Sequence, residues 1–131
     1  MFSIIDLENE VFNTVANALR ASYSGISVYG ETVETPSSFP SVSLVEDDNS
    51  EIEFNRTLAR KPETACNLMY TANVYSNLKT GKKAQAKAIM DVIDQRMHDM
   101  GFIRTMRSQI PNLDRTIYRI TARYTQVYQT F

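Results

Sequence analysis

A two-residue alternation near the end of the chain constrains the fold more than any other feature of the sequence. The segment 116–128 reads TIYRITARYTQVY. Successive side chains of a β-strand point to opposite faces of a sheet, so this alternation predicts a strand rather than a helix. One face would be apolar and pack on a core, whereas the other would carry Arg119, Thr121, Arg123 and Thr125. That second face could be solvated surface, a track for nucleic acid or part of a protein interface.

Further strands and two helices are predicted from the rest of the chain. Runs rich in β-branched or alternating residues predict strands at about 26–30, 41–46, 65–77 and 102–108. Apolar residues at steps of three and four predict helices at about 4–19 and 82–100. Gly101 followed by Phe102 is a typical stop for the second helix.

This order of elements, α-β-β-β-α-β-β, predicts an α+β fold. We expect an antiparallel β-sheet with two α-helices packed on one face. The 131 residues are of the size of one domain, 1–131. A long polar β-hairpin connection is expected at about 46–62, and connections of that length are usually functional or disordered.

The composition is typical of a globular protein and offers little for catalysis. Hydrophobic residues make up 43% of the chain, and no apolar run approaches the roughly 20 residues that cross a bilayer, so no membrane contact is expected. The acidic N-terminal segment does not resemble a secretory signal. A single cysteine, Cys66, excludes an intrachain disulfide and fits a reducing cytoplasm.

Catalytic and cofactor motifs are likewise not found in the sequence. His98 is the only histidine, so a metal site would have to be built from carboxylates. The acidic run that begins at Asp47 fails the calcium-loop pattern, because Ile52 stands where that loop needs glycine. The four glycines form no phosphate-binding loop. We therefore expect no enzyme activity, no catalytic residues, no cofactor and no metal.

Charge is divided unevenly along the chain. Residues 1–53 contain ten acids and one base, a net charge of −9, whereas the remainder contains thirteen bases and five acids, a net charge of +8. Such a chain can present opposite patches to copies of itself. The five arginines of the C-terminal hairpin region also suit a sequence-independent nucleic-acid-binding module, although the net charge of −1 and the tyrosines on the apolar parity argue against it.

The C-terminal half resembles a known family. AIMDVIDQRMHDMGFIRTMRSQIPNLDRTIYRITARYTQVY, with FPSVSLVEDDN and NVYSN upstream, is similar to the tail terminator, or tail-to-head joining (tail completion), proteins of long-tailed siphovirus phages. The resemblance covers most of the chain from about Phe39 onward. It implies a structural virion protein at the tail–head junction, assembled in the host cytoplasm. Another small neck or minor capsid protein is the alternative within the same biology.

The resemblance also implies partners and an interface. Six copies would form a ring that caps the tail tube and joins it to the head-connector (stopper) protein, with non-specific contact to DNA that passes through the ring. In a head-to-tail ring one face of each subunit meets a different face of the next, which suits an acidic segment and an arginine-bearing face on one chain. The residues predicted at this subunit interface are Glu46, Asp47, Asp48, Glu51, Glu53, Arg56, Arg60, Arg104, Arg119 and Arg123.

Overall fold

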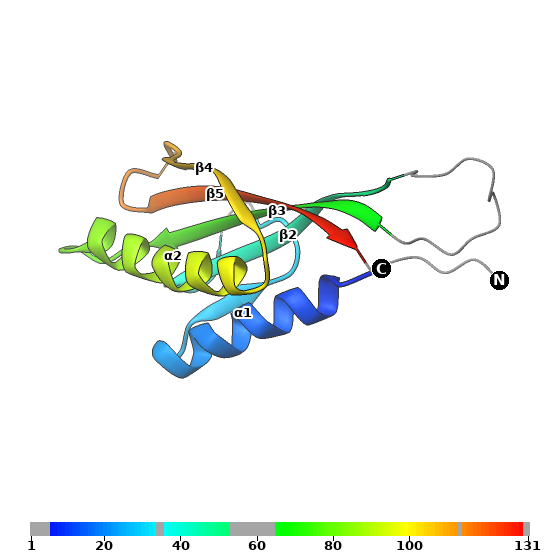
Figure 1. Ribbon diagram of the computed structural model, residues 1–131. Coiled ribbons are helices and arrows are strands. Elements are labelled where there is room, and N and C mark those ends of the chain that lie inside the picture. The colour runs from blue at the N-terminus through cyan, green and yellow to red at the C-terminus, as the bar shows by residue number, and fades with distance from the viewer. Residues whose placement is uncertain (1–5, 34–35, 53–64, 113, 130–131) are drawn as a thin grey trace, which may run out of the picture.

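The computed structural model describes residues 6–33, 36–52, 65–112 and 114–129. It contains two helices and five strands in the predicted order (Figure 1). The elements are α1 (Glu8–Ser22), β1 (Ser27–Tyr29), β2 (Ser41–Glu51), β3 (Ala65–Ser76), α2 (Lys82–Asp99), β4 (Ile103–Gln109) and β5 (Tyr118–Gln129). The predicted α+β fold is confirmed.

All five strands form one sheet in the order β1-β2-β3-β5-β4. The pairs β2–β3, β3–β5 and β4–β5 are antiparallel, as predicted. The short strand β1 differs, because it pairs with β2 in parallel. The sheet is therefore mixed, and the prediction of a purely antiparallel sheet was wrong at this edge. No helix occurs among the described residues between β1 and β2, which are 30–33 and 36–40.

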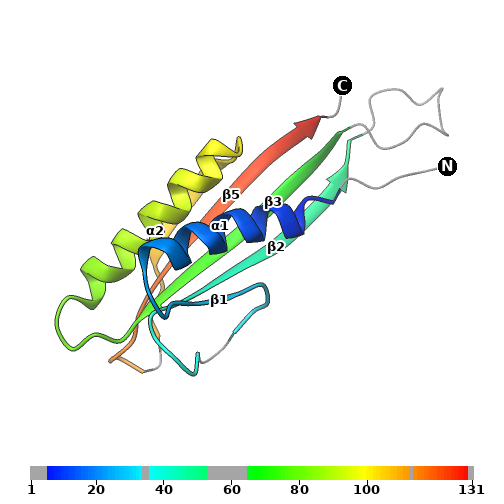
Figure 2. The same cartoon turned by 90° about the horizontal axis from the view of Figure 1, so that it is seen from below.

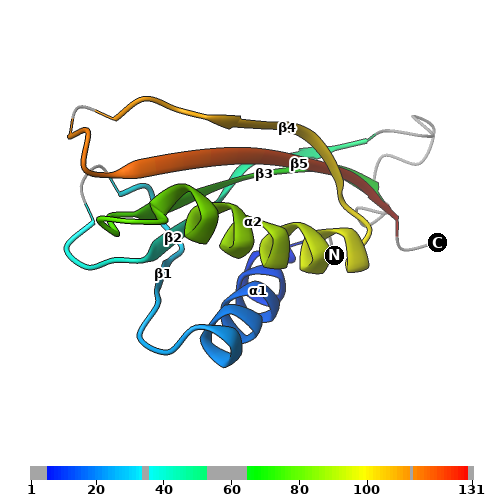
Figure 3. The same cartoon turned by 90° about the vertical axis from the view of Figure 1, so that its left-hand side faces the viewer.

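Both helices cover the same face of the sheet, which confirms the predicted layers (Figures 1 and 3). Seen from the helix side, α2 runs along β3 and β5, and α1 lies beside it toward the β1–β2 side (Figure 2). The buried core between the layers includes Val11, Val15, Ile89, Ile93 and Met97 from the helices, and Leu68, Tyr70, Tyr118 and Ile120 from the strands. No helix of the described residues lies on the opposite face (Figures 1 and 3).

The acidic segment after Val45 is a strand and not a loop. β2 continues to Glu51, and its pairing with β3 shifts by one residue between Glu46 and Asp48. A shift of this kind is a β-bulge, which inserts one extra residue and bends the strand. The predicted connection of about 46–62 was therefore wrong in its first part, and residues 53–62 of it lie outside the described residues.

Candidate subunit interface

The face of the sheet that carries no helix is the candidate interface. Cross-strand pairing places alternate residues of β3 and β5 on it, in the rows Tyr75–Arg119, Asn73–Thr121, Thr71–Arg123 and Met69–Thr125. We call this surface the helix-free face and define it by Met69, Thr71, Asn73 and Tyr75 of β3, with Arg119, Thr121, Arg123, Thr125 and Val127 of β5. The alternation of β5 predicted that its arginines and threonines share one face, and the structure places them on the helix-free face.

Arg119 is bound within its own subunit. Its Nε and Nη2 donate hydrogen bonds of 3.1 and 3.0 Å to Asn73 Oδ1, and Thr121 Oγ1 donates one of 2.6 Å to the same oxygen. The guanidinium also lies 5.6 Å from the centre of the Tyr75 ring, within the range of a cation–π contact. These contacts give Arg119 a role in holding the sheet together, which the sequence did not reveal.

Arg123, in contrast, is exposed on the same face. Among the described residues no hydrogen bond or ion pair involves its guanidinium; only its backbone carbonyl accepts a hydrogen bond, from Thr105 Oγ1. Its cross-strand neighbour Thr71 donates a hydrogen bond to the Asp47 carboxylate. Asp47, the extra residue of the bulge in β2, and the exposed Arg123 of β5 therefore both lie beside Thr71 of β3.

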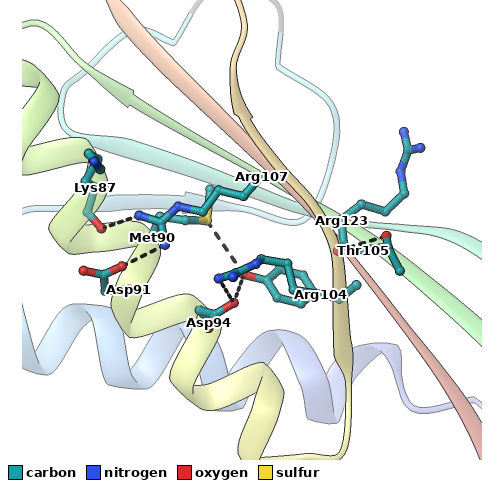
Figure 4. Close-up of polar contacts among 9 residues, drawn as sticks. Lys87, Met90, Asp91, Asp94, Arg104, Thr105, Arg107 and Arg123 are labelled. Carbon is teal, nitrogen blue, oxygen red and sulfur yellow. Dashed lines mark hydrogen bonds and ion pairs between the residues drawn. The ribbon is translucent and has the colours of Figure 1, made fainter.

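Arg104 lies on the other face, although it was predicted at the interface. Arg104 Nη1 is 3.1 Å from Asp94 Oδ1, and Arg107 Nη1 is 2.8 Å from Asp91 Oδ1. Figure 4 shows both arginines reaching from β4 toward α2, whereas Arg123 points away from the helix. The two ion pairs connect α2 to the edge strand, and they explain why the helix carries acids in its C-terminal half.

The Asp94 carboxylate has a second partner. Tyr124 Oη donates a hydrogen bond of 3.1 Å to Asp94 Oδ1 and also lies 3.9 Å from Met90 Sδ. Burial, and after it the charge of Asp94, raises the pKa of Tyr124, so the phenol stays protonated and remains a donor. This contact connects β5 to α2 in the interior.

Two exposed apolar side chains add to the helix-free face. Ile103 and Val127 are 69% and 53% exposed. Ile103 pairs with Thr125 across β4 and β5, and Val127 pairs with Asn67, so both lie beside the row of Met69. Depletion of charge at the centre with arginine nearby is typical of protein interfaces. Neither residue was predicted from the sequence, although Val127 has the same odd-numbered alternation as Arg123, which was a signal for it.

The predicted acidic residues separate into different surroundings. Asp47, Asp48 and Glu51 are exposed, and Ser50 Oγ donates a hydrogen bond of 2.6 Å to Asp48 Oδ2. Glu46 is half-buried and pairs with Tyr70, which places it on the helix side of the sheet. Glu53, Arg56 and Arg60 lie outside the described residues.

Neither metal-binding clusters nor bilayer-spanning helices occur in the described part of the chain. Within it, no three His, Cys, Asp or Glu side chains form a group suited to a metal ion, and neither helix is long and apolar enough to cross a bilayer. Comparisons with models of known protein families and with curated proteins found no match for this chain. What the helix-free face offers is a binding surface of mixed apolar and charged character.

Proposed function

We propose that this chain is a structural virion protein that assembles into a ring, caps the tail tube of a siphovirus and joins the tail to the head connector. The proposal rests on the sequence resemblance to tail terminator proteins together with one structural observation. That observation is the helix-free face, where Ile103 and Val127 are exposed beside Arg123 and no described element covers them.

The distribution of charge supports contact between different faces of neighbouring copies. Asp47 and Asp48 extend from β2 on one side of β3, and Arg123 lies on β5 on the other side. A head-to-tail contact can bring the acids of one subunit to the arginine of the next, and repetition of that contact closes a ring when the rotation is suitable. Complementary charges of this kind chiefly provide orientation and specificity.

Arg119 supports the ring proposal less than its position on the strand suggests. Its guanidinium already donates two hydrogen bonds to Asn73 Oδ1. If Arg119 turned toward a neighbouring subunit, that buried amide oxygen would lose both donors. Arg123 is therefore the arginine of β5 that we assign to the neighbouring subunit. The same reasoning removes Arg104 from the interface, because Asp94 holds it against α2.

Nucleic-acid binding is the second candidate function, because exposed arginine and the basic C-terminal part suit phosphate contacts. Most arginines of β4 and β5 are held within the subunit, however. Arg104 and Arg107 are paired with acids, and Arg119 is held by Asn73. Binding to DNA by an arginine track needs several unpaired cations along one surface, which makes a protein interface the better proposal.

The experiment that tests the proposal is the mass and shape of the full chain in solution. We expect sedimentation over a range of protein concentrations to show one closed oligomer, and electron microscopy to show a ring with a central opening. Addition of duplex DNA at several salt concentrations separates the alternatives. A monomer at every concentration that shifts DNA in a strongly salt-dependent way would replace the ring proposal with the nucleic-acid one.

A further inference from the structure

The sheet has two edges that are open to a further strand. β4 (Ile103–Gln109) is the last strand on one side, and only β5 pairs with it among the described residues. On the other side, β1 pairs only with residues 41–43 of β2. Residues 44–51 of β2 pair with β3 alone in the part of the chain that the structure describes. We call β4 and residues 44–51 the β4 edge and the β2 edge. Each presents a row of backbone N–H and C=O groups that another strand can bind.

The hydrogen bonds to β5 show which backbone groups of the β4 edge point outward. In an antiparallel pair, residues alternate between bonding to the neighbouring strand and facing away from it. Ile110 N–H donates to Arg119 O, so the backbone groups of Gln109 and Arg107 face away from β5. The bulge in β4 moves the next outward residue to Arg104. The outward residues 109, 107 and 104 therefore follow one another at steps of two and three.

The β2 edge has the same spacing in the opposite direction along the chain. Ile52 N–H donates to Ala65 O, so the backbone groups of Asn49 face away from β3. The bulge in β2 moves the preceding outward residues to Glu46 and Leu44. The outward residues 44, 46 and 49 thus also follow one another at steps of two and three. The two edges match, residue for residue, when they pair antiparallel.

We propose that the β4 edge of one copy pairs antiparallel with the β2 edge of a second copy, with Arg107 opposite Glu46 and Arg104 opposite Asn49. Within one subunit β4 and β2 already run in opposite directions. Rotation about an axis along the strands conserves these directions, so repetition of the contact gives a ring with one continuous sheet. The inference rests on the proposed ring and names one of its contacts.

Charge favours this pairing over the pairing of two identical edges. β4 carries Arg104 and Arg107, so β4 against β4 would bring arginines of two copies together. The β2 edge carries four acids, so β2 against β2 would bring carboxylates together. β4 against β2 instead sets Arg107 opposite Glu46, whose Oε1 is buried and has no hydrogen-bond partner in the described structure. The occupant of the β4 edge is therefore the β2 edge of a neighbour.

The same register connects the two edges to the helix-free face. It sets the bulge of β2, which contains Asp47, beside the bulge of β4 at Thr105 and Met106. Met106 is the cross-strand partner of Arg123, and Thr105 Oγ1 donates a hydrogen bond to Arg123 O. Asp47 of a neighbour thus approaches the exposed Arg123 with only β4 between their strands, which is the charge contact that the ring proposal uses.

Disulfide cross-links test this register. Antiparallel pairs without backbone hydrogen bonds between their two residues bring side chains closest, within the reach of a disulfide. In the proposed register Ser108 lies opposite Val45 in such a pair, and Ile103 lies opposite Ser50. A chain with Ser108→Cys and Val45→Cys, or one with Ile103→Cys and Ser50→Cys, should form a ladder of covalent oligomers on oxidation. The native Cys66 is 0% exposed and does not compete.

The matched controls exchange the partners. Ser108→Cys with Ser50→Cys, and Ile103→Cys with Val45→Cys, place the two cysteines several residues apart in the proposed register. Both controls should run as monomers on a denaturing gel without reductant. The four chains carry the same kinds of substitution, so a difference between them reports the register and not the reactivity of a cysteine.

A proline substitution tests the outward N–H groups independently. Gln109→Pro removes an N–H that faces away from β5, and proline is tolerated at such positions of an edge strand. We expect circular dichroism to show a folded subunit and sedimentation to show association weakened about tenfold, because each contact loses a backbone hydrogen bond. Glu51→Pro is the control, since this outward residue of β2 lies beyond the end of β4 in the proposed register and should leave association unchanged.

The results separate the edge pairing from the ring. Cross-links in the exchanged pairs, or no cross-links in either matched pair of chains that still form rings, would overturn the edge pairing and leave the ring in place. A wild-type chain that never associates would overturn both.

Discussion

Asn73 determines which arginine of β5 is available to a partner. The residue is 9% exposed, and its Oδ1 accepts from Arg119 and Thr121 while its Nδ2 lies 3.4 Å from Ser43 Oγ. Because β3 lies between β2 and β5, one amide connects three strands on the helix-free face. The side-chain alternation predicted both Arg119 and Arg123 on one face as candidates for a partner. The hydrogen bonds to Asn73 show that Arg119 is held within its own subunit, whereas Arg123 is exposed.

Replacing Asn73 by alanine should therefore destabilise the subunit. The change leaves the Thr121 hydroxyl and the Arg119 guanidinium without their shared acceptor, at a cost of roughly 1–3 kcal/mol for groups that are largely shielded from water. Urea unfolding of the full chain measures the difference in free energy. Asn67→Ala, an exposed position of the same strand and face, is the control and should change stability by less than about 0.5 kcal/mol. Equal effects at both positions would show that the Asn73 contacts are not stabilising.

Glu46 should make stability depend on pH in an unusual direction for an acid. Its pKa is raised in the folded subunit by burial and by Glu8 and Asp6, so the folded state binds the proton more tightly than the unfolded state does. Folding is then favoured as the pH falls through the raised value and is opposed at neutral pH. Glu46→Gln should be more stable than the wild type at neutral pH, and the advantage should shrink in mild acid. Chemical unfolding at several pH values measures it. A variant that is less stable than the wild type at neutral pH would contradict this account of Glu46.

At the scale of elements, α2 shows a stop that the sequence predicted well. Gly101 has φ +94°, a left-handed conformation, and its N–H donates to His98 O while Phe102 N–H donates to Met97 O. These bonds end the helix and bring the buried Phe102 back into the core, where its ring lies 5.3 Å from that of Tyr70. The Gly-Phe pair was sufficient to predict this stop because glycine tolerates positive φ.

Gly101→Ala tests the role of that conformation. A side chain at positive φ costs about 1–2 kcal/mol, and the added Cβ would also lie 2.6 Å from Gln126 Nε2, which has to move. We expect a lower melting temperature and a lower free energy of unfolding. Gly30→Ala is the control, since Gly30 has no positive φ and a Cβ there would make ordinary contacts with Phe12. A loss of stability as large at Gly30 as at Gly101 would show that φ is not the cause.

The full length of β2 and the parallel pairing of β1 could not be predicted, and the reasons are physical. β2 continues through Asp47, Asp48 and Asn49, residue types that are depleted in strands, because pairing with β3 and a bulge outweigh their low propensity. β1 has only three residues, and no local pattern in so short a strand specifies parallel pairing with β2. The two-residue alternation of β5, in contrast, correctly predicted which of its side chains are apolar and face the core and which lie on the opposite face.

The candidate site was predicted in part for the same reason. Alternation located Arg119 and Arg123 on one face, but the partner of Arg119 is 46 residues away in the sequence. Arg104 and Arg107 are three residues apart and still share a face, because the register of β4 shifts between Arg104 and Met106. A bulge reverses parity and cannot be read from the alternation of one strand.

For the whole molecule, the fold places the acids and the unpaired arginines of the chain on different sides of the sheet. The acids of α1 and β2 lie toward the β1 side of the sheet, and the unpaired arginines of β5 and its preceding turn lie toward the β4 side. A subunit with opposite charge on its two sides favours association in one orientation and disfavours the reverse. This arrangement is the basis for proposing a closed ring rather than a symmetric dimer.

The measurement that tests this claim most directly is the oligomeric state of a single charge reversal. Arg123→Glu places a carboxylate on the helix-free face without disturbing a described side-chain contact, and Arg20→Glu makes the same change of charge on α1. Sedimentation of both, with circular dichroism to establish folding, should give a folded monomer for Arg123→Glu and the wild-type oligomer for Arg20→Glu. A folded Arg123→Glu protein that still forms full-size rings would contradict the assignment of the helix-free face as the subunit interface.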